Sequence, residues 1–301
     1  MRALVTGSAG FAGQYLAASL LADGVEVAGF DVREGRDVSD VRDYEALRAV
    51  MDACEPDLIF HLAAVSWPGE SLTDPRRCMD VNVTGALNVL EAVRHSGSHA
   101  RVLLAGTSEE YGYEGREPGA TLDEAAACHP TTPYGASKLA ASALGMAYAR
   151  RYGLPVVVTR AFNHTGAGRQ AVNAESAFAR RIVAVERGEA DHVPHGDLTA
   201  VRDFTDVRDV IAAYRLAIMA APGIYNVCSE TQFSLRTVMD MLASLSTAPD
   251  LVLKEDPALV RRDHGLFPRT SAARLREATG WQRSIPLKDT LADVLDYWRG
   301  R

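Results

Sequence analysis

The sequence predicts an α/β protein in which a doubly wound parallel sheet is joined by a smaller, interleaved C-terminal lobe. Two observations predict this fold class. Short apolar runs alternate with amphipathic helical patterns through the first half of the chain, and a glycine-rich turn follows the first of these runs. Strict alternation of strand and helix implies right-handed crossovers and a parallel sheet covered on both faces, with ligands bound at the carboxyl ends of its strands.

The expected strands of the sheet are short apolar runs typical of buried β-strands, at 2–6, 25–30, 58–64, 101–105 and 156–160. Helical patterns fill the intervals between these runs, and the first of them covers 14–22. Beyond residue 163 the alternation loosens, and the later elements expected are helices at 174–187 and 207–219, a strand at 223–227 and two further helices.

Gly7, Gly10 and Gly13 form a Gly-x-x-Gly-x-x-Gly turn between the first strand and the first helix. Glycines at these positions permit a tight turn and a close approach of the backbone to a diphosphate. The N-terminus of the following helix supplies unpaired N–H groups and the positive end of its dipole. Elsewhere in a chain with 24 glycines this spacing would be weak evidence, but directly after the first strand it indicates dinucleotide binding.

Asp31 closes the second strand, where an acidic side chain accepts hydrogen bonds from the adenosine ribose diol and repels a 2′-phosphate. This position favours NADH. Arg33 and Arg36 follow closely, and a guanidinium there could bind the 2′-phosphate of NADPH or lie in a solvated loop. Both NADPH and NADH therefore stay candidates for the cofactor, and Asp37 and Val38 are expected beside the adenine.

These elements divide the chain into two interleaved parts, and no long linker separates them. We expect a Rossmann-like NAD(P)-binding domain over 1–163, with 201–228 returning to it. The remaining segments, 164–200 and 229–301, are expected to form a substrate-binding lobe.

Composition excludes several classes of partner. The 301 residues carry a net charge of −7 without a run of lysine or arginine, so neither nucleic acid nor an anionic membrane surface is expected as a partner. Four scattered cysteines and eight histidines show no ligand spacing, so no disulfide framework and no metal site are expected. The chain opens directly on its first strand and no apolar run approaches the length of a membrane span, so a cytoplasmic protein is expected.

Lys138 is one of only three lysines in a chain whose other 29 basic positions are arginine, and it follows Tyr134 by four residues. A lysine kept in such a composition suggests that a compact ammonium is required. Residues four apart share one face of a helix, so the ammonium could lie beneath the Tyr134 phenol and lower its pKa. Tyr134 would then exchange a proton near neutral pH. The alternative is an exposed pair at helical spacing.

Hydroxyl and carboxyl groups follow the fourth strand, on the side of the sheet that binds ligand. Thr107 and Ser108 come first, and a hydroxyl there can hydrogen-bond a substrate carbonyl. Glu109 and Glu110 come next. Glu110 is expected to be a solvated loop carboxylate, because charged side chains are mostly exposed.

Taken together, four of these features resemble one protein family over essentially the whole chain: the Gly7/Gly10/Gly13 turn, His61-Leu-Ala-Ala64, Thr107-Ser108 and Tyr134-x-x-x-Lys138. They are similar to the extended short-chain dehydrogenases/reductases that act on nucleotide sugars. The resemblance implies that Thr107, Tyr134 and Lys138 are catalytic. It implies cofactor contacts by Gly7, Gly10, Phe11, Ala12, Gly13, Asp31, Arg33, Asp37, Val38, Leu62, Ala63, Ala64, Tyr134, Lys138 and Phe162. It implies substrate contacts by Ser66, Ser108, Glu109, Asn163, Arg180, Arg202 and Arg261.

Within that family, the segments 108–112, 137–139, 160–166, 201–209 and 225–229 resemble the members that reduce a GDP-linked 4-keto sugar. The resemblance implies NAD(P)H-dependent reduction of a nucleotide-linked 4-keto-6-deoxy hexose, with GDP-4-keto-6-deoxy-D-mannose giving GDP-D-rhamnose. Glu109 would then hydrogen-bond a sugar hydroxyl, whereas the dehydratases use this position as a base. A 4,6-dehydratase or 4-epimerase with tightly bound NAD(P) is the alternative, and a non-catalytic nucleotide sensor is a third interpretation. The family also implies a homodimer formed through the helices near 81–94 and 134–150.

Overall fold

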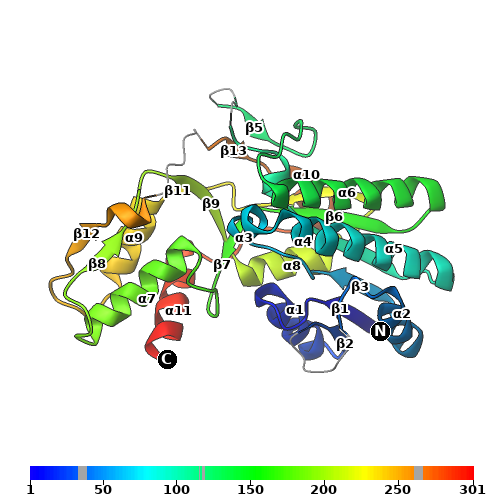
Figure 1. The fold of residues 1–301 in the computed structure, drawn as a ribbon, viewed down its shortest axis with the longest axis horizontal. Helices are drawn as coiled ribbons and strands as arrows, with labels where there is room; N and C mark the ends of the chain where they lie inside the picture. Colours follow the sequence, from blue (N-terminus) through cyan, green and yellow to red (C-terminus); the bar gives the residue numbers. More distant parts are fainter. Residues whose placement is uncertain (33–38, 115, 117–118, 261–266) are drawn as a thin grey trace.

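The computed structural model describes residues 1–32, 39–114, 116, 119–260 and 267–301, and it has two layered parts (Figure 1). The larger part is built on a six-stranded sheet in the order β10-β6-β4-β3-β1-β2, in which every neighbouring pair is parallel. Its strands are β1 (Arg2–Thr6), β2 (Glu26–Phe30), β3 (Leu58–His61), β4 (Arg101–Thr107), β6 (Val156–Ala161) and β10 (Gly223–Val227).

Helices cover both faces of this sheet. One face is covered by α1 (Phe11–Ala22), α8 (Val207–Ala217) and α10 (Ala273–Thr279), and the other by α2 (Tyr44–Cys54), α5 (Gly85–Ser96) and α6 (Pro133–Tyr152). Successive side chains of a strand point to opposite faces, so Leu103 joins the apolar cluster under α1 and α8 while Leu104 joins the cluster under α2 and α5.

The crossover from β3 to β4 contains three helical pieces before α5: α3 (Pro68–Thr73), α4 (Pro75–Met79) and the π-helical turn η1 (Asp80–Thr84). Asn82 of this turn is buried. Its side-chain oxygen accepts from the N–H of Val65 at 2.8 Å, and its amide donates to Ser137 Oγ at 2.8 Å. The turn therefore fastens the loop after β3 to α6, close to Tyr134.

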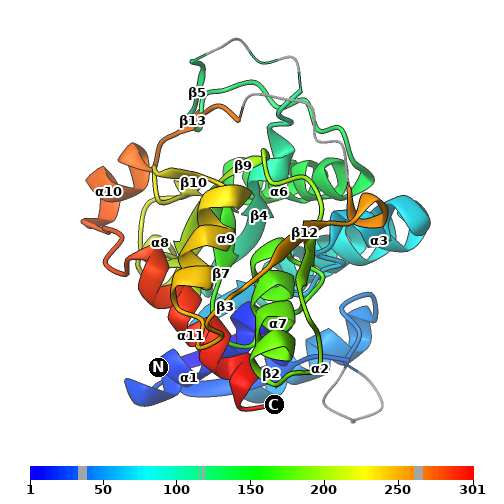
Figure 2. The ribbon, with the colours of Figure 1, turned by 90° about the vertical axis from the view of Figure 1, so that its left-hand side faces the viewer.

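Of the described elements, the smaller part contains three helices and two short sheets (Figure 2). Its helices α7 (Ala174–Glu186), α9 (Leu235–Ser244) and α11 (Leu287–Arg299) share one apolar cluster. Beside them, β9 (Val201–Asp206) lies between β7 (Asn163–Thr165) and β11 (Gln232–Ser234), and β8 (Val193–His195) pairs with β12 (Leu253–Glu255). The remaining elements are β5 (Thr121–Leu122), which pairs with β13 (Arg269–Thr270), and the 3-10 turns η2 (Ser108–Glu110) and η3 (Pro257–Leu259).

The strands and helices expected from the sequence are present, with shifted ends. β10 has the expected bounds, and α7 and α8 end one and two residues early. β3 ends at His61 and not at residue 64, because the backbone of Leu62 and Ala63 packs against Gly7 of the glycine turn. β4 continues past residue 105 to Thr107. The described chain has three helices after β10 where two were expected. The boundaries proposed for the two functional domains stay a prediction.

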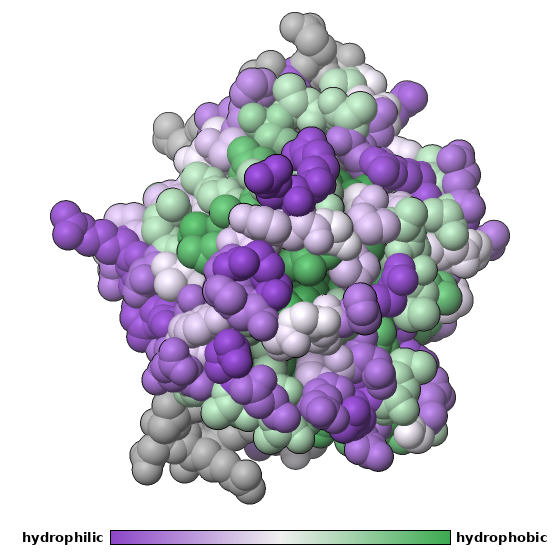
Figure 3. Space-filling model, turned by 90° about the vertical axis from the view of Figure 1, so that its right-hand side faces the viewer, coloured by the Kyte–Doolittle hydropathy of each residue, from purple (hydrophilic) through white to green (hydrophobic). Residues whose placement is uncertain are grey.

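The face at which the parallel strands begin has a mixed surface. Hydrophilic side chains are spread over it, with apolar groups between them (Figure 3). In the described part of the chain, no helix combines the length and the apolar character needed to cross a membrane.

Glu110 is fully buried, so the expectation of a solvated loop carboxylate is wrong. Its carboxylate pairs with Arg160 of β6 at 2.8 Å and accepts hydrogen bonds from Ser142 Oγ of α6 and from the N–H of Thr107, each at 3.0 Å. The ion pair and the two hydrogen bonds replace the water that would otherwise solvate the Glu110 carboxylate. A charged group can be buried in a protein when it has such partners. These contacts join the end of β4 to β6 and α6.

We expect Glu110→Ala to lower the free energy of unfolding by about 3 to 5 kcal/mol, because it leaves Arg160 charged, buried and unpaired. The matched control is Asp240→Ala, which removes one member of the exposed pair Arg236–Asp240 and should cost less than about 1 kcal/mol. Urea unfolding followed by circular dichroism measures both values. Equal effects of the two substitutions would contradict the role given to the buried carboxylate.

Candidate active site

A cleft of about 530 Å³ lies at the carboxyl ends of β1, β3, β4 and β6. It is lined by most of the side chains and glycines that the sequence predicts as site residues, although they come from separate parts of the chain. Those that line it are Gly7, Gly10, Phe11, Ala12, Gly13, Asp31, Leu62, Ala63, Ala64, Ser66, Thr107, Ser108, Glu109, Tyr134, Lys138, Phe162 and Asn163.

Two predicted arginines do not line this cleft. Arg180 is exposed on α7, with its guanidinium 5.9 Å from the ring of Trp298. Arg202 of β9 donates to the carbonyl of Val201 at 2.7 Å and lies 5.6 Å from the ring of Phe267. The predicted residues Arg33, Asp37, Val38 and Arg261, and the alternative Arg36, fall outside the described residues.

The glycine turn is held by close backbone contacts. Gly7 has φ +74°, and a Cβ there would lie 2.7 Å from the backbone nitrogen of Ala63. A Cβ on Gly13 would overlap the carbonyl oxygen of Gly7, which accepts the N–H of Gly10 at 3.0 Å. No side chain of the described residues caps α1 at Gly10. The first N–H groups of α1 are therefore available to an anion in the cleft, and the turn fits a nucleotide diphosphate.

Asp31 directly follows β2 and lies beside the glycine turn. Only 7% of it is exposed, and its carboxylate accepts the N–H of Ala9 at 3.1 Å. This bond connects the end of β2 to the glycine turn. A carboxylate in this place suits a ribose diol, as the sequence predicts.

Tyr134 and Lys138 lie in the first turns of α6, which begins at a Thr132 cap that accepts the N–H of Gly135 at 3.0 Å. Lys138 Nζ donates to the carbonyl of Ala105 at 2.7 Å. Burial lowers the pKa of Lys138 to about 8, so this side chain is a cation at neutral pH.

The Tyr134 phenol does not have the lowered pKa that the sequence predicts. Burial raises the pKa of Tyr134, and a hydrogen bond to Thr107 opposes the shift in part. Removal of solvent from the phenol is the largest cause of the raised pKa. The phenol is therefore protonated at neutral pH, in the form that can donate.

Thr107 and Ser108 stand where β4 passes into η2. The N–H of Thr107 is held by the buried Glu110 carboxylate, so the ion pair with Arg160 also sets the position of the Thr107 hydroxyl beside Tyr134. Ser108 Oγ accepts from the phenol of Tyr113 at 2.6 Å. The hydroxyl groups of Thr107, at the end of β4, and of Tyr134, on α6, therefore lie next to each other in the cleft.

Glu109 is half-buried and lines the cleft next to these hydroxyls. Burial raises its pKa, and the charge of Arg202 acts in the opposite direction. Arg202 therefore lies close enough to affect the pKa of Glu109, although it does not line the cleft itself. A carboxyl group with a raised pKa in a cleft can serve either as an acid or as a hydrogen-bond partner.

Several cleft residues were not predicted from the sequence: Trp67, Arg77, His164, Arg169, Gln170, Asn173 and Tyr214. Arg169 was not predicted, because the sequence analysis did not distinguish it from the other arginines of the chain, 29 in all. His164 is neutral, because burial lowers its pKa to about 4, and its ring stacks on that of Phe11. Among the described residues, no group of three or more His, Cys, Asp or Glu side chains is placed to hold a metal ion.

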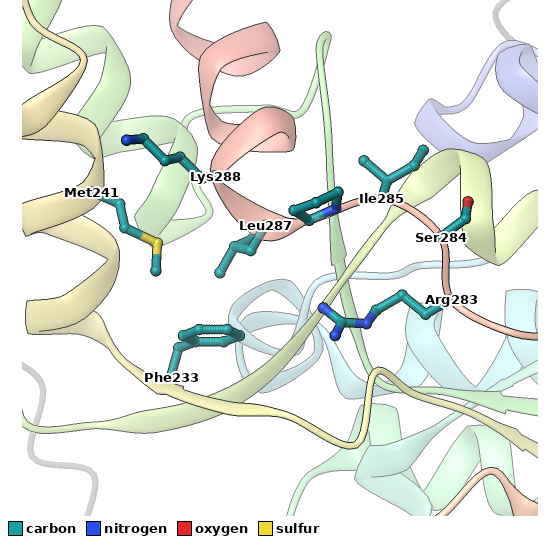
Figure 4. A pocket seen from close by; sticks show the side chains of 8 residues that line it. Phe233, Met241, Arg283, Ser284, Ile285, Leu287 and Lys288 are labelled. Carbon is teal, nitrogen blue, oxygen red and sulfur yellow. The ribbon is translucent and has the colours of Figure 1, made fainter.

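A second, smaller cavity of about 290 Å³ lies in the smaller part of the molecule. Figure 4 shows Phe233, Met241 and Leu287 around it, with Arg283 and Lys288 at its margin. It has apolar walls and none of the predicted catalytic side chains. The cleft at the strand ends is therefore the candidate active site.

Comparisons with known proteins agree with this geometry. The family model described as GDP-mannose 4,6 dehydratase matches residues 4–294. The chain belongs to this family of short-chain dehydrogenases/reductases. The GDP-6-deoxy-D-mannose reductase of Pseudomonas aeruginosa is 33% identical over 303 residues, which are 100% of this chain and 98% of the relative.

Two solved structures share the fold of this short-chain dehydrogenase/reductase over 100% of its chain and 99% of theirs. One is RMD from Pseudomonas aeruginosa complexed with NADPH, with a TM-score of 0.88 and 32% identity. The other is the UDP-glucose 4-epimerase of Thermus thermophilus in complex with NAD, with a TM-score of 0.86 and 29% identity. The Rossmann-like fold class and the enzyme family predicted from the sequence are confirmed.

We expect Gly7→Ala to weaken binding of NADPH and NADH by at least about tenfold. The added methyl group would meet the backbone of Ala63, and moving either segment costs several ordinary contacts. Gly188→Ala is the control, since Gly188 has φ +71° but no atom within 4 Å of the added Cβ. Quenching of protein fluorescence measures the dissociation constants. Equal affinities of the two variants would show that the turn tolerates displacement.

Proposed function

We propose that this enzyme is an NAD(P)H-dependent 4-ketoreductase of a nucleotide-linked 4-keto-6-deoxy hexose, and that it converts GDP-4-keto-6-deoxy-D-mannose to GDP-D-rhamnose. The observation that carries the proposal is the pairing of the Thr107 and Tyr134 hydroxyls in the cleft, in a chain similar over its full length to a GDP-6-deoxy-D-mannose reductase. Two hydroxyl donors suit a carbonyl oxygen that gains negative charge.

A nicotinamide cofactor supplies the hydride that such a reduction needs. The glycine turn and Asp31 are the residues that would hold it. Tyr134 donates its phenolic proton to the oxygen of the sugar carbonyl, which becomes the C4 alcohol, and the phenolate regains a proton from solvent. Thr107 donates a hydrogen bond to the same oxygen, and the Lys138 ammonium favours the transient phenolate.

The substrate contacts follow the sequence-based assignment. Glu109, Ser108 and Ser66 offer oxygen atoms to the sugar hydroxyls, and Asn163 lines the same cleft. Arg202 and Arg180, which belong to the smaller part of the chain, would reach the nucleotide diphosphate only if they turn toward the cleft. Arginine forks suit two phosphate oxygens at once.

A 4,6-dehydratase or 4-epimerase is the second candidate function, and Glu109 is the observation that favours it. A cleft carboxyl group whose pKa is raised by burial is poised for proton transfer at carbon. Such an enzyme oxidises and re-reduces its own substrate, so its cofactor stays bound and no coenzyme is consumed.

The test supplies GDP-4-keto-6-deoxymannose with NADPH, and separately with NADH, and follows the absorbance of the reduced coenzyme together with NMR of the product. Stoichiometric oxidation with formation of GDP-rhamnose supports the reductase and ranks the two coenzymes. Conversion of GDP-mannose or UDP-glucose without added coenzyme, by protein purified with bound cofactor, would replace the proposal with the dehydratase or epimerase.

We expect Tyr134→Phe to lower kcat by about two to four powers of ten, because it removes the group that donates the proton. The control is Tyr152→Phe on the same helix, since Tyr152 is half-exposed at the opposite end of α6. Steady-state kinetics with both variants gives the comparison. A Tyr134→Phe enzyme as active as the control would remove Tyr134 from the mechanism.

The pH dependence follows from Lys138. Its pKa of about 8 lies below the ordinary lysine value, so the ammonium is present below pH 8 and is lost as the pH rises through 8. We expect kcat/KM to be level on the acid side of this value and to fall above it. Lys138→Arg should be slower at neutral pH but lack this decline, because a guanidinium keeps its proton. A wild-type profile that stays level to about pH 10, the ordinary lysine range, would contradict the assignment.

A further inference from the structure

Tyr113 follows η2 in the chain and does not itself line the cleft. Its phenol donates to the Oγ of Ser108 at 2.6 Å, and Ser108 does line the cleft. The Tyr113 ring packs against the apolar cluster of the larger part of the molecule, with its centre 4.9 Å from that of the Phe267 ring. Phe267 does not line the cleft either, so this contact holds the Tyr113 ring in place independently of a ligand.

The phenol is the donor of this hydrogen bond. A phenol is a stronger acid than an aliphatic alcohol, so Tyr113 gives its proton and Ser108 accepts it. Burial raises the pKa of Tyr113, the charge of Glu109 raises it further, and the bond to Ser108 opposes both. Tyr113 is therefore protonated at neutral pH, in the form that donates to Ser108.

The hydroxyl proton of Ser108 itself is available to a ligand. Only 3% of Ser108 is exposed, and across the described segments its hydroxyl forms no hydrogen bond in which it donates. A hydroxyl that accepts one hydrogen bond donates a second more strongly, because hydrogen bonds in a chain polarise one another. Since Ser108 directly follows Thr107, this proton lies in the part of the cleft that holds the Thr107 and Tyr134 hydroxyls.

We propose that Tyr113 is a positioning residue, which holds the Ser108 hydroxyl so that it donates a hydrogen bond to an oxygen atom of the sugar. The inference rests on the proposed function only in that a nucleotide sugar occupies the cleft. Thr107 and Tyr134 act on the carbonyl oxygen that reacts, whereas Ser108 binds an oxygen atom whose charge does not change. Such a contact is equally strong before and during the reaction, so it contributes to binding of the sugar and not to kcat.

Steady-state kinetics with Tyr113→Phe tests this role, because phenylalanine keeps the ring against Phe267 and removes only the donor. With GDP-4-keto-6-deoxymannose and NADPH, we expect KM for the sugar to rise about three- to tenfold and kcat to change less than about twofold. The control is Tyr44→Phe, which removes a phenol that contacts His95 away from the cleft and should leave both constants unchanged.

Ser108→Ala shows whether Tyr113 acts through Ser108. We expect this substitution to raise KM at least as much as Tyr113→Phe does. Adding Tyr113→Phe to Ser108→Ala should raise KM no further, because both substitutions remove the same contact. An unchanged KM in Tyr113→Phe, or an equal rise with and without the Ser108 hydroxyl, would overturn the proposal.

Equilibrium binding separates this proposal from the identity of the reaction. Calorimetry compares GDP-mannose with GDP, and UDP-glucose with UDP, so that each pair differs in the sugar. For the pair that the wild type binds, Tyr113→Phe should weaken the nucleotide sugar about three- to tenfold and leave the free nucleotide and NADPH unchanged. A wild type that does not reduce the keto sugar would reject the proposed function and leave this comparison intact. Parallel weakening of the nucleotide sugar, the free nucleotide and NADPH would show that Tyr113 only supports the local fold, and would overturn the proposal.

Discussion

The candidate site depends on one buried carboxylate. Glu110 accepts from Arg160, Ser142 and the backbone of Thr107, and these partners belong to β6, α6 and β4. Each contact is ordinary in length, but together they hold the two elements that carry the Thr107 and Tyr134 hydroxyls in a fixed relation. A pair of hydroxyls can act on one oxygen only if both are placed before the substrate arrives. The buried ion pair therefore has a geometric function besides its contribution to stability.

The parts of this molecule that depend on local pattern could be predicted from the sequence. β10 has the expected bounds because a short apolar run with a glycine at its start leaves few alternatives, and the glycine turn has its expected place because it sits between a strand and a helix. Thr107 and Tyr134 line the cleft, and both were named by the resemblance to the family.

The parts that depend on partners distant in the chain could not be predicted. Glu110 was expected in solvent, since the residues around it do not show that β6, which carries Arg160, pairs with β4. The pKa of Tyr134 was expected to be lowered, since the sequence does not show how deeply the first turns of α6 are buried. Arg180 and Arg169 show the same limit: Arg180, chosen by resemblance, is exposed on α7, whereas Arg169, which lines the cleft, was not predicted.

The position of β10 has a consequence for the order in which the chain folds. This strand completes the sheet at the edge of β6, but α7, β9 and α8 lie between the two strands in the sequence. Until residue 227 has left the ribosome, β6 presents an open edge of unpaired N–H and C=O groups. The nascent enzyme therefore passes through a stage in which its first domain is assembled on one side only, and α7, β9 and α8 are synthesised during that stage.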